Sequence, residues 1–451
     1  MLYKTVEMHI ILIQTGVHIM IINLKIENFR SYKNETNVSF VSNSKIRKNK
    51  DHETNVGGLS VIKNCAILGS NASGKSNLIR VISFLKNIVL GLPNIDNFSF
   101  KGQENKPTSI DIVFSKKDKI YNYGFKIIKS NKLISYYEIV SEYLYEIKKT
   151  SSYLVFDIEK DKVTISGKYL NDKNLKLYID GYFRGINQLF LSYINMPDKI
   201  IENEDLRKIL LDSYLFIKND LVVITSKDDK NFSLIDSSNV KNISIYLKKF
   251  DTGIEEIKFS KCSREEVIKS IPETMFQQFI YDANRLGKSN FTIFNNKDLL
   301  QINLTKNGID IQKLVSKHNN IDGFFNFESE SEGTIRMMFL ISVLFTPGNE
   351  EKVFFIDELE RSMHPLMSKK LIEEFQKLNF LFRNQLIFTT HYEKIIDECV
   401  RRDEIYFCDK NNQGESYIVS LLEYESRSDS SVSKNYLEGR YGGVPKLEVD
   451  L

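Results

Sequence analysis

The chain has 451 residues, of which 42% are hydrophobic and 27% are charged, with a formal net charge of +3. This length suits two or three structural units with real cores, and the balanced charge excludes a bulk field that would by itself indicate nucleic acid or membrane binding. Four widely spaced cysteines form no C-x-x-C pair, so neither a zinc site nor a disulfide framework is indicated. A reducing cytoplasm fits this composition.

The N-terminal region predicts a strand that begins at Met20, where apolar and polar residues start to alternate. Residues 10–22 are mostly apolar, but polar residues interrupt them, and the stretch is short for a membrane span. It also lacks the small-residue cleavage site of an export signal. We therefore expect no membrane association, and we treat residues 1–19 as an N-terminal extension of uncertain status.

Residues 69–76 read Gly-Ser-Asn-Ala-Ser-Gly-Lys-Ser, which is the G-x-x-x-x-G-K-S pattern of a phosphate-binding loop. A β-prone apolar stretch precedes the loop and residues 77–85 have helical spacing, so backbone N–H groups and a helix dipole would face a polyphosphate. Lys75 is expected to reach the β/γ-phosphates of ATP, and Ser76 to bind Mg²⁺. The predicted nucleotide-binding residues are Gly69, Ser70, Asn71, Ala72, Ser73, Gly74, Lys75, Ser76 and Asn77.

The middle of the chain changes from strand to helix patterns. Alternation predicts strands at 109–114, 121–127, 133–145, 152–157 and 162–165, and helical spacing follows from 170 to 220. Residues 267–286 could hold a helix, and strands are expected between 291 and 304. The predicted domains are an N-terminal ATPase lobe (20–170), a mixed, mainly helical insertion (171–315) and a C-terminal ATPase lobe (316–451).

A second set of candidate residues follows a buried strand at residues 353–356, where two acids come directly after four apolar side chains. Asp357 is placed to hold Mg²⁺, directly or through water, and Glu358 to polarise the attacking water as a general base. A helix N-cap is the alternative role for Asp357. His391 ends another apolar stretch, and it could contact the γ-phosphate or support the attacking water, although a lone histidine there is more often a simple hydrogen-bonding residue.

Residues 328–334 lead into an apolar helical stretch at 335–345, which is typical of a buried helix. Ser331 and Gly333 would lie at its N-terminus, where free N–H groups favour an anion. On local sequence alone, a serine N-cap beside acidic residues is the favoured interpretation. The alternative is a second phosphate grip that reaches a nucleotide held by another subunit.

The order of these motifs resembles that of ABC-type ATPases. The segment Asn28-Phe29-Arg30-Ser31 resembles the SMC, RecF and OLD-like branch rather than transporters. Residues 331–334, 357–365 and 436–445 are similar to stand-alone bacterial AAA/ABC ATPases associated with abortive infection. The resemblance covers about 20–145 and 315–451 and is vague between them.

This resemblance implies an α/β fold, namely a P-loop NTPase head of ABC type with a β-rich N-terminal lobe and a mainly helical insertion. It implies ATP and Mg²⁺ as ligands and a head-to-tail homodimer or larger assembly, in which Ser331 and Gly333 act in trans. It also implies control of a separate nuclease or TOPRIM-type effector in anti-phage defence. No acidic cluster after Leu421 resembles a nuclease centre, so such an effector would be a partner protein.

Two other functions remain open. One is DNA repair or chromosome maintenance with direct DNA binding, and the other is a scaffold that hydrolyses ATP slowly. Lysines within 45–50 and 116–119 would permit nucleic-acid contact, but a solvated loop is the favoured interpretation. Gln103 is the nearest candidate for a Q-loop glutamine. The remaining ambiguous residues are Arg361, Ser362 and Met363, as interface loop or helix entry, and Arg440 and Tyr441, as structural or partner-binding.

Overall fold

The computed structural model describes residues 18–92, 97–130, 137–148, 151–159, 162–182, 188–225, 234–285, 289–294, 298–306, 308–346, 350–424 and 431–444. The chain forms two compact units. Unit 1 contains the residues up to Val223 together with Glu351–Asp357 and Arg383–Leu451, and unit 2 contains Ile224–Glu350 and Glu358–Phe382. None of the described helices is long and apolar enough to cross a membrane.

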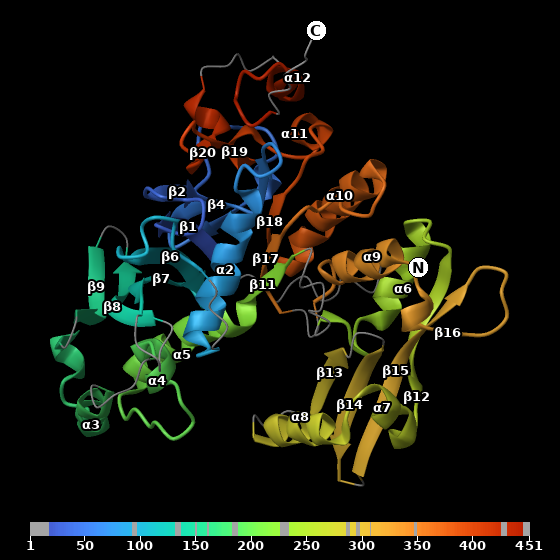
Figure 1. Cartoon of the computed structure of the whole chain (residues 1–451), viewed down its shortest axis with the longest axis horizontal. Helices are drawn as coiled ribbons and strands as arrows, with labels where there is room; N and C mark the ends of the chain where they lie inside the picture. The colour runs from blue at the N-terminus through green and yellow to red at the C-terminus, as the bar shows by residue number, and fades with distance from the viewer. Residues whose placement is uncertain are drawn as a thin grey trace. The chain divides into compact units, whose positions relative to one another are not determined.

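Unit 1 holds a seven-stranded sheet with the order β10-β9-β8-β7-β6-β1-β2 (Figure 1). Its strands pair antiparallel and alternate between buried and more exposed side chains, as the sequence predicts. The strands are β1 (Met20–Glu27), β2 (Thr36–Ser39), β6 (Thr108–Lys116), β7 (Lys119–Lys129), β8 (Tyr137–Lys148), β9 (Ser151–Glu159) and β10 (Lys162–Ile165). The predicted β-rich lobe is confirmed.

Helices follow this sheet in the chain and pack on it through aromatic side chains. Phe190 lies edge-on to Phe156 of β9 at 5.2 Å, and Phe216 stacks on Phe114 of β6 at 4.0 Å between ring centroids. The helices are α3 (Lys173–Tyr182), α4 (Phe190–Ile194), α5 (Glu204–Leu215) and the π-helical turn η4 (Phe216–Asp220). This agrees with the helical pattern predicted for 170–220.

A six-stranded sheet with the order β11-β17-β18-β5-β19-β20 forms the other half of unit 1. The strands β17, β18, β5 and β19 run parallel, and β20 is antiparallel to β19. The strands are β5 (Asn64–Leu68), β11 (Leu221–Ile224), β17 (Val353–Ile356), β18 (Gln385–Thr389), β19 (Ile405–Lys410) and β20 (Ser416–Ser420). Residues in β5, β17 and β18 are buried along their whole length, as a continuous apolar pattern predicts for central parallel strands.

Short elements complete unit 1. The hairpin of β3 (Glu53–Val56) and β4 (Leu59–Ile62) precedes β5, and α2 (Lys75–Val89) follows it. Near the C-terminus, α11 (Lys394–Glu398) contacts α12 (Val432–Leu437). Strand β1 begins at Met20 as predicted, and Ile19 N donates to Glu351 Oε2 at 2.9 Å. The other residues of the predicted extension, 1–17, lie outside the described residues.

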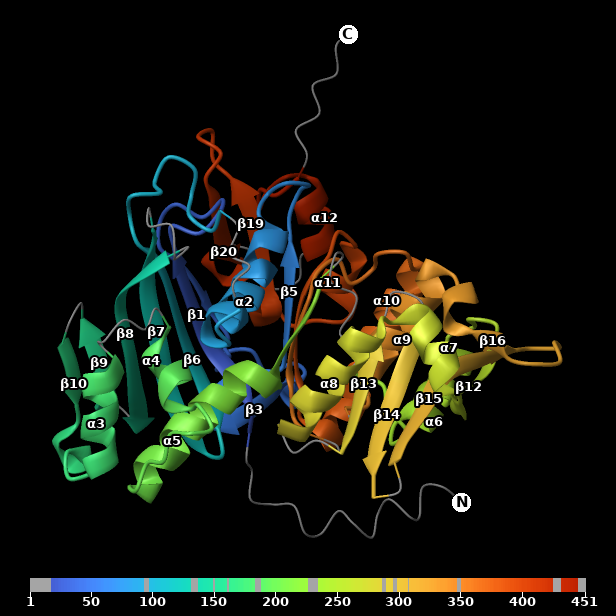
Figure 2. The same cartoon turned by 60° about the horizontal axis from the view of Figure 1, so that its bottom comes forward.

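Unit 2 is built on an antiparallel sheet with the order β12-β15-β14-β13 and a short β16 paired to β15 (Figure 2). The strands are β12 (Ile254–Lys261), β13 (Asn290–Phe294), β14 (Leu299–Thr305), β15 (Gly308–His318) and β16 (Phe325–Asn326). Its helices are α6 (Val240–Lys249), α7 (Arg264–Ser270), α8 (Glu273–Arg285), α9 (Glu332–Ser342) and α10 (Pro365–Phe382).

Two sequence predictions for unit 2 can be compared with these elements. The helix expected at 267–286 occurs as two helices, because Pro272 lacks an N–H group and lies between α7 and α8. The strands expected between 291 and 304 are β13 and β14. The overall α/β class is confirmed, and the predicted domain boundaries stay predictions.

A buried charge cluster joins the two sheets of unit 1. The carboxylate of Asp220 pairs with Lys116 Nζ from β6, and it lies 3.7 Å from Lys352 Nζ, which immediately precedes β17. All three residues are at least 90% buried. Lys86 Nζ of α2 donates to the Leu221 carbonyl nearby. Buried charges of this kind depend on their partners, because desolvation is costly.

Substitution Asp220→Asn is expected to lower the free energy of unfolding by about 3 kcal/mol, because two buried lysines lose their shared carboxylate. Chemical denaturation of the full chain measures this change. The control is Asp198→Asn, whose side chain is 68% exposed and pairs with the adjacent Lys199. That control should leave the free energy of unfolding nearly unchanged, because an exposed ion pair is screened by water. Equal effects of the two substitutions would contradict the role of the cluster.

The pH dependence of stability offers a second test. Burial, assisted by the nearby charge of Lys352, lowers the pKa of Lys86 to about 8. Between pH 8 and the unfolded pKa near 10.5, the folded state binds fewer protons than the unfolded state, so this lysine makes stability rise with pH. The Lys86→Met variant should lack this contribution, worth up to about 3 kcal/mol across the window. If the free energy of unfolding changes with pH in the same way for both proteins from pH 7 to 10.5, this contribution of Lys86 is refuted.

Candidate functional site

The phosphate loop leaves the buried end of β5 and enters α2 at Lys75, as predicted. Its first and last glycines lie where no side chain would fit. A Cβ on Gly69 would lie 2.2 Å from the Cys408 carbonyl oxygen, and a Cβ on Gly74 would lie 2.3 Å from Ser416 Oγ. Gly74 also has φ +122°, which L side chains rarely adopt. The glycines of the motif therefore allow close backbone packing beneath the loop.

The loop presents side chains that suit a polyphosphate. Lys75 is buried, and its Nζ donates to the carbonyl oxygens of Gly69 at 2.7 Å and Ser70 at 2.8 Å. Ser73 Oγ is buried and makes no hydrogen bond within the described part of the chain. Ser76 is the second residue of α2, at the positive end of the helix dipole. These residues fit a nucleoside triphosphate, and a role for Ser76 toward Mg²⁺ stays a prediction.

Residues that are distant in the sequence support the phosphate loop through hydrogen bonds. Tyr32 Oη donates to the Gly74 carbonyl at 3.2 Å, and Asn77 Nδ2 donates to Ser31 Oγ at 2.8 Å. Ser416 of β20 donates from Oγ to the Ser73 carbonyl at 2.5 Å, and its N–H donates to the Ser31 carbonyl at 2.7 Å. The sequence signalled the Asn28–Ser31 segment only by its family resemblance, and it did not signal Ser416.

Asp357 lies at the same sheet edge as the phosphate loop. Ile356 is in register with Phe388, and Phe388 with Ala66, so the C-terminal ends of β17, β18 and β5 are neighbours. Asp357 is buried, and its Oδ1 accepts a hydrogen bond of 2.7 Å from Thr389 Oγ1. The alternative N-cap role is not observed, because the next helix, α10, begins only at Pro365. The sequence did not identify Thr389 as the residue that orients this carboxylate.

His391 also belongs to this edge of unit 1, two residues after the end of β18. Its side chain is exposed, whereas Thr390 before it is buried and donates its N–H to the Ile67 carbonyl at 3.1 Å. The β18 strand end is thereby tied to β5. A role for His391 toward a γ-phosphate stays a prediction.

The other predicted residues lie in unit 2. Glu358 adopts φ +49°, and its carbonyl oxygen accepts hydrogen bonds from the Arg361 N–H at 3.0 Å and from Nη2 of the buried Arg336 at 3.4 Å. A left-handed conformation costs a non-glycine residue about 1 kcal/mol, and such conformations cluster at functional sites. Arg336 is a supporting residue that the sequence analysis missed.

Ser331 caps α9, as the favoured interpretation of the local sequence predicts. Its Oγ accepts from the Thr334 N–H at 3.1 Å. Gly333 lies against the turn after Glu358, since a Cβ there would come within 2.8 Å of the Ser362 carbonyl oxygen. Arg361 lies 3.7 Å from Glu332 between charged atoms, so the ambiguous loop at 361–363 contacts the start of α9. A trans contact of Ser331 and Gly333 with a nucleotide stays a prediction.

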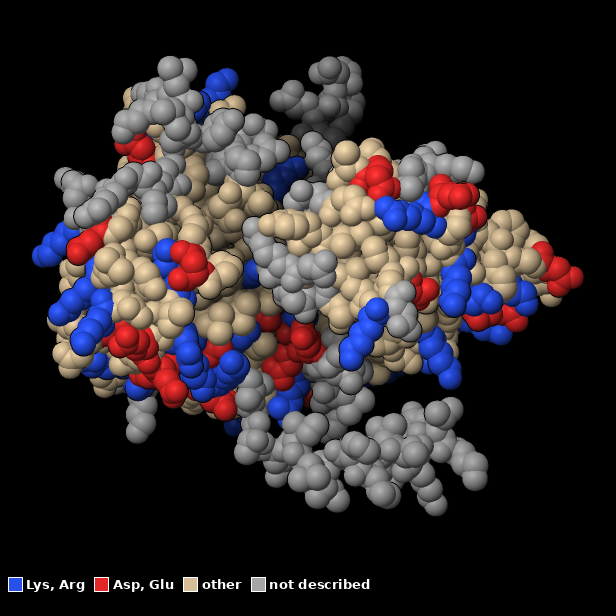
Figure 3. Space-filling view, turned by 90° about the horizontal axis from the view of Figure 1, so that it is seen from below, with Lys and Arg blue, Asp and Glu red and all other residues tan. Residues whose placement is uncertain are grey.

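The lysines considered for nucleic-acid contact at 116–119 are paired with acids of unit 1. Lys116 pairs with Asp220, Lys117 Nζ lies 2.6 Å from Asp212, and Lys119 Nζ lies 3.2 Å from both Glu146 and Asp205. On the face in Figure 3, basic and acidic side chains are interspersed rather than gathered by sign. These contacts disfavour the 116–119 turn as a DNA-binding surface.

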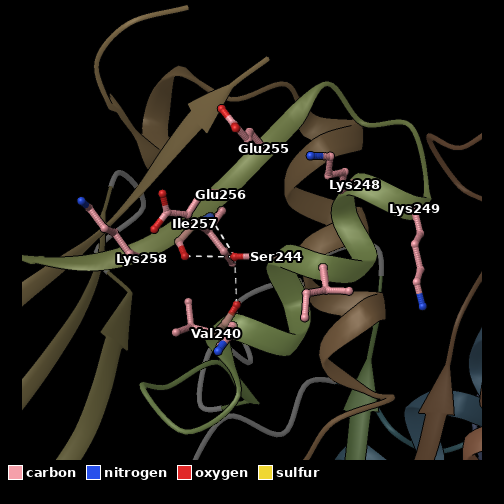
Figure 4. A pocket seen from close by; sticks show the side chains of 10 residues that line it. Val240, Ser244, Lys248, Lys249, Glu255, Glu256, Ile257 and Lys258 are labelled. Carbon is pink, nitrogen blue, oxygen red and sulfur yellow. Dashed lines mark hydrogen bonds between the residues drawn. The ribbon is translucent and has the colours of Figure 1, made fainter. Parts of the chain in front are cut away.

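Unit 2 has a separate open groove of about 720 Å³ between α6 and β12 (Figure 4). Ser244 lies in the floor of the groove and satisfies a backbone position of β12. Its Oγ donates to the Ile257 carbonyl and accepts from the Ile257 N–H. Lysines including Lys248 and Lys258 and the acids Glu255 and Glu256 line the rim. The groove holds none of the predicted site residues.

The strand–loop–helix unit and the acid that follows another parallel strand of the same sheet place this chain among the P-loop nucleotide-binding proteins. A family model described as "AAA domain, putative AbiEii toxin, Type IV TA system" matches residues 65–397. The chain belongs to this AAA-domain family. No curated protein matches it.

Solved structures show weak likenesses. The SMC head domain from Thermotoga maritima is 11% identical with a TM-score of 0.38, covering 90% of this chain and 99% of that one. An SmcHead bound to the C-winged helix domain of ScpA is 15% identical, also at 0.38, with coverage of 90% and 99%. An Smc head with an extended coiled coil, bound to the C-terminal domain of ScpA derived from Pyrococcus furiosus, is 13% identical at 0.38, with coverage of 90% and 97%.

The close packing at the first loop glycine predicts that Gly69→Ala weakens ATP binding by roughly tenfold to a hundredfold, because the loop must move away from Cys408. Isothermal titration of ATP with Mg²⁺ measures this affinity. The matched control is Gly102→Ala, at φ +90° with open space around its Cβ position. This control carries the backbone penalty without a clash and should keep the wild-type affinity. Wild-type affinity in Gly69→Ala would contradict the packing argument.

Proposed function

We propose that this protein binds and hydrolyses ATP with Mg²⁺ and that it works as a head-to-tail homodimer or larger assembly. The observation that carries the proposal is the convergence of the phosphate loop and Asp357 at one edge of the parallel sheet. Lys75 would bind the phosphates, and Ser76 and Asp357 would hold the metal ion. Mg²⁺ would neutralise charge on the phosphate oxygens.

The hydrolytic role of Glu358 rests on its position directly after Asp357. A carboxylate there can accept a proton from water, which is the role of a general base. Its main chain is held in a left-handed turn by Arg336 and Arg361, so its position is constrained rather than free. His391, after β18, would support the attacking water or contact the γ-phosphate.

A shared site between two copies is supported by the helix start at Ser331 and Gly333. This helix N-terminus can stabilise negative charge, and Gly333 is packed against the turn that follows Glu358. If two half-sites surround the γ-phosphate, ATP binding favours the closed dimer and hydrolysis reopens it. The dimer would then respond to the state of the nucleotide.

The biological role that we propose is regulation of a separate effector in anti-phage defence. The family description, which names a putative AbiEii toxin and a type IV toxin–antitoxin system, supports this role. The motif resemblance to abortive-infection ATPases points the same way. Direct DNA binding in repair is the second candidate, and the paired lysines at 116–119 weigh against one of its two proposed surfaces. The third candidate, a scaffold that hydrolyses ATP slowly, differs from both of these roles in its rate of ATP turnover.

The Glu358→Gln variant is expected to bind ATP and to form an ATP-dependent dimer, while ATP hydrolysis falls by roughly a hundredfold or more. Solution mass with and without ATP and Mg²⁺ measures assembly, and phosphate release measures turnover. The control Glu373→Gln replaces a partly exposed acid of α10 that pairs with Lys369, and it should behave as wild type. A monomer that hydrolyses ATP at the full rate would refute the shared site.

A separate measurement distinguishes regulation of an effector protein from direct DNA binding. ATP turnover of the wild-type protein with and without DNA separates the two roles: no DNA stimulation is expected of an effector regulator, and stimulation would favour the repair role. A small nuclease gene beside the gene for this protein would further support the defence role.

A further inference from the structure

The C-terminal part of unit 1 returns to the phosphate loop. Residues 438–443, here called the closing turn, follow α12 and lie on strand β19. Strand β19 pairs with β5 in parallel, with Phe407 in register with Leu68, the residue before Gly69. In the sequence this stretch stands out only by its family resemblance, and the proposed chemistry does not use it.

The backbones of the closing turn, the phosphate loop and strand β19 meet without side chains between them. A Cβ on Gly443 would lie 3.2 Å from both the Gly69 Cα and the Cys408 carbonyl oxygen. Gly442 and Gly443 have φ values of +69° and +67°, a region that favours glycine. The closing turn therefore rests directly on the first glycine of the phosphate loop.

Two polar contacts hold the closing turn in this position. Asp409 Oδ2 accepts a hydrogen bond of 2.8 Å from the Gly443 N–H, and Tyr436 Oη donates to the Gly443 carbonyl at 2.9 Å. Both groups of one residue, its N–H and its C=O, are thus fixed by side chains. Burial raises the pKa of Tyr436 to about 12, so its hydroxyl keeps its proton at neutral pH.

Aromatic stacking anchors the closing turn to the same strand. The rings of Tyr436 and Tyr441 both stack on Phe407, at centroid distances of 5.3 Å and 5.0 Å and interplanar angles of 19° and 16°. Tyr424 Oη also donates to the Tyr441 carbonyl at 2.9 Å. Successive residues of β19 therefore contact the closing turn by ring, carbonyl and carboxylate.

We propose that Tyr436 and Asp409 are positioning residues for nucleotide binding, which act by pressing the closing turn against Gly69 and so fixing the phosphate loop. This inference rests on the proposed ATP binding. Loss of either contact should loosen the loop and raise the Kd for ATP, with no change in the groups that would touch the nucleotide. The C-terminal region would then set the affinity of a phosphate loop whose residues lie more than 300 positions earlier in the chain.

The test compares two tyrosine substitutions in the full chain. Tyr436→Phe removes the hydroxyl that binds the Gly443 carbonyl and keeps the ring on Phe407. Tyr182→Phe is the matched control, because Tyr182 is equally buried, at 6% exposure, and its hydroxyl donates to a backbone carbonyl, that of Gln188, at 2.8 Å. Each variant is assayed for melting temperature and for ATP affinity by isothermal titration with Mg²⁺.

Both substitutions should lower the melting temperature by similar amounts, but only Tyr436→Phe should raise the Kd for ATP, by about three- to tenfold. Asp409→Ala should have the same effect on Kd, and Asp409→Asn, which keeps an acceptor oxygen, should restore much of the affinity. Wild-type affinity in both Tyr436→Phe and Asp409→Ala would overturn the inference while leaving ATP binding intact. Failure of the wild-type protein to bind ATP would instead overturn the proposed function and this inference with it.

Discussion

The parallel hydrogen-bond ladder through β17, β18 and β5 is the constraint on which the candidate site depends. Parallel strands bring their C-terminal ends to one edge, so the phosphate loop meets Asp357 and Thr390 there, although the loop lies hundreds of residues before them in the chain. Apolar side chains on both faces of these strands hold the ladder away from water. The polar groups at the edge are then positioned by the backbone that precedes them.

Close packing of backbone segments is the second feature of unit 1 on which the phosphate loop depends. Beneath the phosphate loop, Gly69 and Gly74 allow β19 and β20 to approach within distances that exclude a Cβ. Hydrogen bonds from Tyr32 and Ser416 also fix the carbonyl groups of Gly74 and Ser73 in the loop. A loop supported in this way is preorganised, and this lowers the entropy that ligand binding would otherwise cost.

The catalytic proposal places its residues on both units. Asp357 and the phosphate loop belong to unit 1, whereas Glu358, Ser331 and Gly333 belong to unit 2. The chain changes unit between two adjacent acids, and the second acid has a left-handed backbone held by Arg336. The turn after Glu358 contacts the start of α9, because the Ser362 carbonyl lies against Gly333 and Arg361 lies 3.7 Å from Glu332 between charged atoms.

The sequence by itself determined the local units of this protein. The phosphate loop between a strand and a helix, the strand that ends at Asp357, and the Ser331 cap of α9 are encoded by glycine spacing, apolar runs and a capping residue, all of which act within about ten residues. The α/β class and the β-rich lobe follow from the same periodicities. The break between α7 and α8 was not predicted, although Pro272 is a local signal for it.

Only the tertiary structure decided which distant residues serve the site. Thr389 orients Asp357, Ser416 binds the loop at Ser73, and Gly443 rests on Gly69, because strand order and register bring them together. From the sequence alone, the lysines at 116–119 are expected to form an exposed basic turn. The structure shows that they pair with acidic residues on a later helix. Long-range contacts of this kind depend on the order of strands in a sheet, and no local pattern in the sequence specifies that order.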